Sequence, residues 1–181
     1  GTSTGNIDDI RAIDPLTTPG VKIFMGASTG NMLVDDPAVL DAVFRDAPTP
    51  IITHCEDSPM IDAELAKYRA RYGDDIPVEF HGEIRSRAAC LKSTELAISL
   101  ARKHDARLHV LHISTADELA LFERGPLIRA DGSRKRITAE TCIHFLRFDR
   151  ADYARLGHLI RCNPAIKDAS DREAITPALP A

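Results

Sequence analysis

Apolar runs and amphipathic stretches alternate along the chain. Short runs rich in Val, Ile and Leu at 20–25, 50–55 and 108–113 indicate buried strands, because each is brief and bounded by turn-forming residues. A further strand is expected at 136–141, and helices are expected at 6–13, from 35 or 36 onward, and at 60–72, 83–103, 115–122 and 149–156. Strand–helix alternation with apolar strands predicts a parallel sheet covered by helices.

Several residues predict where the helices begin and end. Asp35 or Asp36 can cap a helix that has Pro37 in its first turn, and Gly73 is a typical helix stop. The segment 83–103 is predicted to be one long helix, with these apolar contacts: Leu91, Leu96, Ile98, Leu100 and Ala101.

Three polar side chains interrupt the predicted strands. Lys22 lies within the first apolar run, and His54 and His112 lie near the ends of the next two. A buried ammonium must lose its charge, find an anion or reach water. Right-handed crossovers bring the carboxyl ends of parallel strands to one edge of the sheet. We therefore expect the three residues to share one site, although a solvent-reaching lysine and two core histidines are the simpler alternatives.

Each of these residues suits a metal centre. A lysine with a lowered pKa can capture carbon dioxide as a carbamate, an anion whose two oxygens can bridge two cations. Neutral imidazoles such as those of His54 and His112 are good zinc ligands. His109 lies three residues before His112, so on a continuous strand it faces the opposite way, and we expect it to be a packing residue. The remaining histidines are assigned ordinary loop or helix roles: His81, His104, His144 and His158.

The loop after the first strand lacks the Gly-Lys-Ser/Thr ending of a phosphate loop. Ser28 and Thr29 could offer hydroxyl donors from a mobile loop over the site. Glu56 and Asp57 are expected to be acids at a helix start rather than catalysts.

Bulk composition excludes several classes of function. The chain has 181 residues, 44% hydrophobic and 28% charged, with a net charge of −4, which favours neither nucleic acid nor a membrane surface as partner. No apolar run approaches the roughly 18 residues of a membrane helix. The four cysteines form no CxxC pair, so a reducing, cytoplasmic location is expected. A start at Gly1 and an irregular end suggest a piece of a longer chain.

Five segments together resemble the dihydroorotases of the amidohydrolase superfamily. They are GVKIFMGASTGNM at 20–32, THCE at 53–56, LHVLHISTA at 108–116, TAETCIH at 138–144 and RCNPAIK at 161–167. The resemblance implies a (β/α)8 barrel, known as a TIM barrel, with two zinc ions in its mouth. Lys22 would be the carboxylated bridging lysine of the fourth strand, and His54 and His112 the metal ligands of the fifth and sixth. The main chain of Asn163 would contact the pyrimidine ring, and Ser28 and Thr29 would lie on the mobile substrate loop.

Parts of the family pattern are absent. The His-x-His and arginine of the first strand and the aspartate of the eighth do not occur, and Phe145 stands where a second histidine is expected. Residues 1–181 are therefore expected to be a fragment of one α/β barrel domain, covering strands four to seven with their helices. With three of about six family ligands, the isolated fragment is expected to be inactive.

The resemblance predicts that the complete protein interconverts dihydroorotate and N-carbamoyl-L-aspartate in de novo pyrimidine biosynthesis, with two Zn²⁺ per site. Hydantoinase (dihydropyrimidinase) and allantoinase are alternatives that share the same lysine and histidines, and a non-catalytic barrel scaffold is an alternative of another class. The expected partners are a small-molecule pyrimidine precursor and further copies of the chain in a homo-oligomer.

Overall fold

The centre of the molecule is a parallel sheet whose strands are neighbours in the order in which they occur along the chain. A computed structural model describes residues 1–26 and 33–179. Its strands are β1 (Val21–Met25), β2 (Ile51–Cys55), β3 (Leu108–Val110) and β4 (Ile137–Ala139), in the order β1-β2-β3-β4. This sequential parallel order confirms the predicted part of a (β/α)8 barrel.

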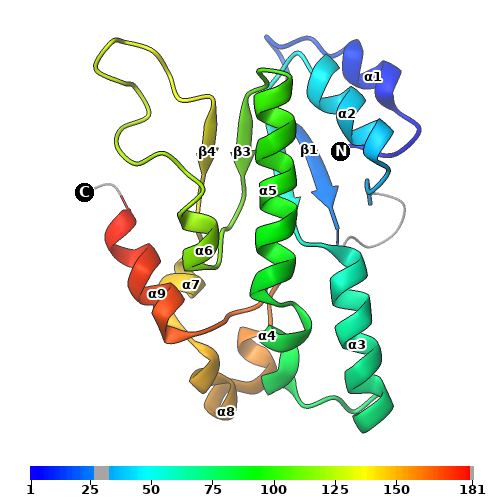
Figure 1. Cartoon of the computed structure of the whole chain (residues 1–181), viewed down its shortest axis with the longest axis vertical. Coiled ribbons are helices and arrows are strands. Elements are labelled where there is room, and N and C mark those ends of the chain that lie inside the picture. The colour runs from blue at the N-terminus through cyan, green and yellow to red at the C-terminus, as the bar shows by residue number, and fades with distance from the viewer. Residues whose placement is uncertain (27–32, 180–181) are drawn as a thin grey trace.

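Helices connect the strands and extend beyond them. The helices are α1 (Ile7–Arg11), α2 (Pro37–Asp46), α3 (Ser58–Tyr72), α4 (His81–Ile84), α5 (Arg87–Lys103), α6 (Ala116–Leu119), α7 (Ile143–Arg147), α8 (Tyr153–Leu156) and α9 (Ala169–Ile175), with 3-10 turns η1 (Val78–Phe80), η2 (Arg150–Asp152), η3 (Gly157–Ile160) and η4 (Thr176–Ala178). Figure 1 shows α3, α4 and α8 beyond the carboxyl ends of the strands. None of the helices in the described ranges is long and apolar enough to cross a membrane.

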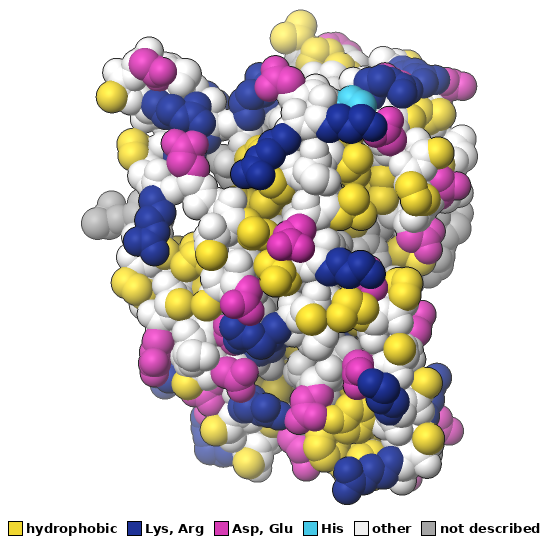
Figure 2. All heavy atoms as spheres, in the orientation of Figure 1, with side chains coloured by type: hydrophobic (Ala, Val, Ile, Leu, Met, Phe, Trp, Pro, Cys, Tyr) yellow, Lys and Arg dark blue, Asp and Glu magenta, His cyan; other side chains and the backbone are white. Residues whose placement is uncertain are grey.

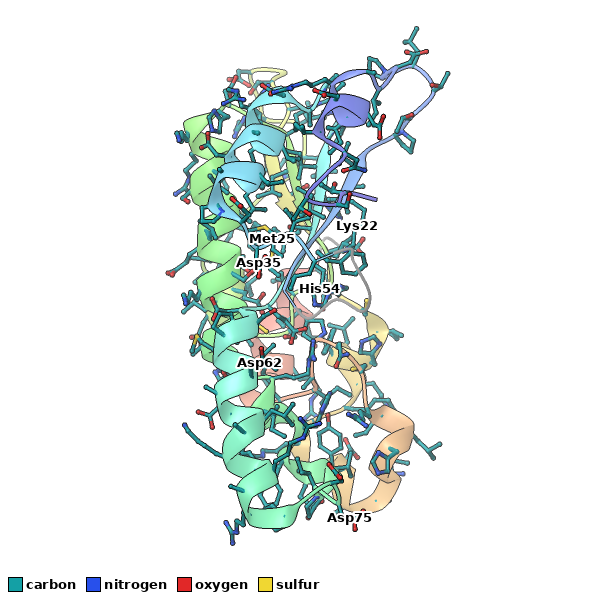
Figure 3. The ribbon with its side chains drawn as sticks, turned by 90° about the vertical axis from the view of Figure 1, so that its right-hand side faces the viewer. Lys22, Met25, Asp35, His54, Asp62 and Asp75 are labelled. Atoms are coloured by element: carbon teal, nitrogen blue, oxygen red, sulfur yellow. The ribbon has the colours of Figure 1, made fainter. Side chains whose placement is uncertain are left out.

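The two faces of the sheet have different environments. Along β1, Val21, Ile23 and Met25 are buried, whereas Lys22 and Phe24 between them are only partly buried. The buried positions pack with the apolar faces of α2 and α5 into the main core. In Figure 3, helices α2, α3 and α5 lie on one side of the sheet, and Lys22 and His54 lie on the other. On the outer face seen in Figure 2, acidic and basic side chains are interspersed.

The predicted helix over 83–103 is interrupted. Helix α4 ends at Ile84 and α5 begins at Arg87, because Ser86 adopts an extended conformation and its side chain accepts a hydrogen bond from the Ala89 amide. A serine at this position competes with a continuous helix by capping a new one. The predicted contact through Leu96 is also wrong, since its side chain is 46% exposed. The buried side of α5 instead consists mainly of small residues: Ala89, Cys90, Ser93, Thr94, Ala97, Ile98 and Ala101.

Strand β3 is shorter than predicted. It ends at Val110, and His112 follows with a φ of 42°. Such a left-handed conformation is uncommon for a residue with a side chain, and it breaks the two-residue alternation of a strand. The strand expected over 108–113 thus ends before His112, and this turn determines where the His112 side chain points.

We predict that Gly26→Ala destabilises the protein more than Gly73→Ala does. Both glycines have positive φ, but a Cβ at Gly26 would overlap the carbonyl oxygen of Glu56, whereas the space around Gly73 is open. Gly73→Ala should cost about 1–3 kcal/mol from backbone strain alone. Urea unfolding of the two variants measures the difference. Equal losses of stability would contradict the close approach of Gly26 to the residue after β2.

Candidate active site

Lys22 faces away from the helical layer of the sheet. It is in register with Ile52, and Phe24 is in register with His54, so these four side chains share one face. The Lys22 Nζ atom lies 4.6 Å from the centroid of the Phe24 ring, and that ring is 5.8 Å from the His54 ring. Burial lowers the pKa of Lys22 to about 8, although the nearby Cys55 and Glu140 oppose the shift. An amine with this pKa is partly neutral near physiological pH.

His54 and His112 meet through their ring nitrogens. The distance from His54 Nδ1 to His112 Nε2 is 3.2 Å, and the ring centroids are 4.9 Å apart at 70°. His54 is 5% exposed near the end of β2, and the turn after β3 brings His112 to it. Burial, with smaller contributions from His54 and Lys22, lowers the pKa of His112 to about 4. His112 is therefore neutral at pH 7, as a metal ligand must be.

His109 was predicted to face away from the site, and the structure differs. His109 is in register with Ile52 and thereby with Lys22, so it lies on the same face of the sheet. Its Nδ1 is 2.9 Å from the Thr138 hydroxyl, and its Nε2 is 3.3 Å from a Glu140 carboxylate oxygen. The prediction was wrong because it applied strand alternation across the turn at His112, where the strand has already ended.

Glu56 belongs to the site, although the sequence indicated a helix-start acid. Its side chain is 0% exposed, and its Oε2 lies 2.8 Å from His54 Nε2. Arg85 donates to Glu56 Oε1 from Nε at 3.0 Å and to Oε2 from Nη2. Burial alone would raise the pKa of Glu56, but the hydrogen bonds from His54 and Arg85 lower it to about 2. Asp57 is the helix-start acid, since it accepts from the Met60 amide. The spacing of two residues between His54 and Glu56 was the signal for a shared face.

The remaining predicted residues are placed as follows. Asn163 Oδ1 is 3.1 Å from His81 Nε2, which is also 2.9 Å from the Cys162 carbonyl oxygen. His81, the first residue of α4, is thus a buried histidine whose ring has hydrogen-bond partners, and burial lowers its pKa. Within residues 1–26 and 33–179, no hydrogen bond or ion pair joins Asn163 to His54 or His112. Ser28 and Thr29 lie outside the described residues.

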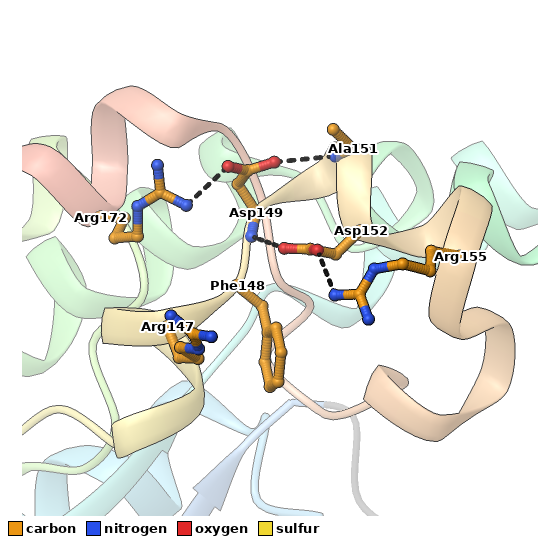
Figure 4. A pocket seen from close by; sticks show the side chains of 7 residues that line it. All are labelled: Arg147, Phe148, Asp149, Ala151, Asp152, Arg155 and Arg172. Carbon is orange, nitrogen blue, oxygen red and sulfur yellow. Dashed lines mark hydrogen bonds and ion pairs between the residues drawn. The ribbon is translucent and has the colours of Figure 1, made fainter.

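Two cavities among the described residues have none of Lys22, His54 and His112 in their walls. One, of about 350 Å³, is bounded by the polar segment around η2 and contains none of the predicted site residues. Figure 4 shows that its charges are largely paired, with Asp149 bound to Arg172 and Asp152 bound to Arg155. The other, of about 360 Å³, includes His81 and Arg85 in its wall and is therefore next to the Glu56 contact.

The two histidines fit one zinc ion. Two nitrogens bound at 2.0–2.1 Å to a tetrahedral zinc are about 3.3–3.4 Å apart, close to the 3.2 Å between His54 Nδ1 and His112 Nε2. A histidine that binds a metal through one ring nitrogen often donates a hydrogen bond from the other nitrogen to a carboxylate. Glu56 is placed to accept such a bond from His54 Nε2. In the part of the chain that the structure describes, no third His, Cys, Asp or Glu completes a metal-binding group. Lys22 lies on the same face of the sheet as His54, and its metal role stays a prediction.

Comparisons with known proteins relate the chain to cyclic amidohydrolases. No family model matches it. An Escherichia coli allantoinase is 26% identical over 94% of this chain and 38% of its own length. The fold is shared with an L-hydantoinase (dihydropyrimidinase) from Arthrobacter aurescens (TM-score 0.80, 23% identity, 94% of this chain and 37% of that one) and a dihydropyrimidinase from Brevibacillus agri (TM-score 0.75, 20% identity, 93% and 36%).

The extent of these matches limits what they establish. The chain spans less than two fifths of the length of the relatives it matches. Over that part, the chain is similar in sequence to allantoinase and shares the fold of hydantoinases. The allantoinase and hydantoinase alternative fits these relatives better than dihydroorotase does.

We predict that acid destabilises the metal-free protein partly through His112. The unfolded chain protonates this histidine near pH 6.5, whereas the folded state keeps it neutral down to about pH 4. Between these values the unfolded state binds more protons, so stability falls as the pH falls. His112→Gln should reduce the loss between pH 7.5 and 5.5 by on the order of 1 kcal/mol.

Urea unfolding at the two pH values measures this difference. The exposed His158 provides a control, because His158→Gln should retain the full acid sensitivity of the wild-type protein. An unchanged pH dependence in His112→Gln would show that His112 is not held neutral by the fold.

Proposed function

We propose that the complete protein hydrolyses a ring amide with the help of bound divalent metal. The observation that carries this proposal is the meeting of His54 Nδ1 and His112 Nε2 at 3.2 Å, with Lys22 on the same face of the sheet. The sequence relationship to allantoinase and the fold shared with hydantoinases support the same class of reaction.

Within this class, we favour a ureide or hydantoin ring as substrate. An Escherichia coli allantoinase is similar in sequence over 94% of the chain. Dihydroorotate is the second candidate, because the segments around Lys22, His54 and Asn163 resemble those of dihydroorotases. These substrates share a ring amide that resists attack by water, so the same metal-binding residues could serve each of them.

Lys22 would act as a carbamate. With a pKa of about 8, about a quarter of the side chains are neutral at pH 7.5, compared with about a thousandth for an ordinary lysine. The neutral amine attacks carbon dioxide: a nitrogen–carbon bond forms, one carbon–oxygen double bond opens to a carboxylate, and the proton leaves to solvent. The product replaces a partly buried cation by an anion that can hold metal.

His54 and His112 would hold metal beside this carbamate. Bound divalent metal would polarise the ring carbonyl and lower the pKa of a water molecule, supplying a nucleophile at neutral pH. Glu56 is unsuited to act as the base, because its carboxylate is fully buried and already bound to His54 and Arg85. Glu56 contacts His54 at Nε2, whereas the other ring nitrogen, Nδ1, faces His112.

We predict that Lys22→Ala reduces hydrolysis to background in the complete protein, because the bridging anion is lost. Short carboxylic acids such as acetate or propionate should partly restore the rate by occupying the vacated space. Lys67→Ala, which removes a lysine with a 68% exposed side chain on α3, is the control and should retain full activity. Near-normal turnover by Lys22→Ala without added acid would exclude the bridging role.

A substrate panel tests the specificity. We expect the metal-loaded complete protein to open allantoin or hydantoin with a kcat/KM at least tenfold above that for dihydroorotate. Preference for dihydroorotate would establish the second candidate instead. Absence of bound metal, together with no turnover of any ring amide, would favour the non-catalytic scaffold.

A further inference from the structure

Glu56 and Arg85 form a buried ion pair directly behind His54. The Glu56 side chain has no exposed surface and that of Arg85 is 12% exposed. Both Glu56 oxygens accept from Arg85, and Oε2 also lies 2.8 Å from His54 Nε2. Two-point contact between a planar guanidinium and a carboxylate holds the carboxylate in a defined orientation.

This contact determines which nitrogen of His54 carries the hydrogen. An ionised carboxylate can only accept, so His54 Nε2 must donate to Glu56. In a neutral His54 ring, Nδ1 then presents a lone pair, and that lone pair faces His112 Nε2. Without this constraint, either ring nitrogen of a neutral histidine could carry the hydrogen.

Among the described residues, none constrains His112 in a comparable way. Its Nδ1 atom is buried and has no hydrogen-bond partner among the described residues. In the metal-free protein, His112 Nε2 is therefore free to donate to His54 Nδ1. A bound cation would need the lone pairs of both facing nitrogens, His54 Nδ1 and His112 Nε2. The hydrogen of His112 would then have to move from Nε2 to Nδ1. The two histidines thus differ: one is held in a single tautomer, and the other can change.

The break between α4 and α5 gives Arg85 its position. Arg85 lies between the two helices, with φ −97° and ψ 69°, and Ser86 then starts α5. A continuous helix over 83–103 would direct this side chain along the helix surface instead. The break therefore links the helical layer to the orientation of a histidine at the end of β2.

We propose that Glu56 and Arg85 are positioning residues that keep His54 in the Nε2–H tautomer, with its Nδ1 lone pair facing His112. The part of this inference that concerns metal rests on the proposed function, whereas the tautomer can be measured without metal. We expect His54 to retain its tautomer when metal binds and His112 to change from Nε2–H to Nδ1–H.

Imidazole ¹⁵N chemical shifts of the complete, metal-free protein at pH 7.5 test the tautomer. His54→Gln assigns the His54 signals by their loss. We expect an Nε2–H His54 in the wild type and in Glu56→Asp, and a mixture of tautomers in Glu56→Gln, because an amide can either donate or accept. Arg85→Lys keeps the charge without the two-point contact, and its proportion of Nε2–H His54 should lie between those of the wild type and Glu56→Gln. This variant replaces Glu56→Gln as the test if Glu56→Gln does not fold.

Zinc affinity, measured by competition with a chromophoric chelator, is the second readout. We expect Glu56→Gln to bind Zn²⁺ about 10–100-fold more weakly than the wild type. Glu118→Gln is the matched control, since Glu118 is also a buried acidic side chain, 2% exposed, which accepts hydrogen bonds from Thr94, Ser114 and Thr115. It should change neither the His54 tautomer nor the zinc affinity.

The outcomes separate this inference from the proposed function. A His54 that is Nδ1–H or doubly protonated in the wild type, or a tautomer unchanged in a folded Glu56→Gln, would overturn the positioning role. The same holds if Glu118→Gln alters the tautomer as much as Glu56→Gln does. Failure of the wild type to bind zinc or to open a ring amide would instead overturn the proposed function, and the metal-free spectra would still decide the role of Glu56.

Discussion

The parallel register of β1 to β4 is the constraint on which the rest of the structure depends. Because Val21, Ile51, Leu108 and Ile137 are aligned, one face of each strand contributes to the core beneath α2 and α5. The alternating positions then necessarily face the other way. A shift of one residue in any strand would turn a core side chain toward the site and a polar one toward the helices.

Few charges are buried without partners among the described polar groups around Lys22 and His54. Lys22 has a lowered pKa, His112 is held neutral, and Glu56 is ionised because Arg85 and His54 surround it. Removing one member of the ion pair would leave a buried charge without its partner, which typically costs more than the pair contributes. This requirement couples the geometry of the histidines to the helical layer through Arg85.

Local patterns were sufficient for much of the fold and for two of the site residues. The apolar runs predicted the strands, and the polar residues that interrupt them were expected to share one site; Lys22 and His54 do lie on one face of the sheet. The rule of strand alternation failed at His109 and His112, because a φ of 42° at His112 ends the alternation. No side-chain pattern along the chain reports such a turn, since the turn depends on how the backbone leaves β3.

The sequence by itself determined the parallel α/β architecture and which side chains could supply metal-binding chemistry. These follow from hydrophobic periodicity and from the cost of burying a charge, both of which are local properties. The tertiary structure alone decided that the His112 ring contacts the His54 ring. It also decided that Arg85, 29 residues after Glu56, donates hydrogen bonds to the Glu56 carboxylate. Contacts between such distant residues depend on the packing of α5 against the sheet, which no short segment of the chain encodes.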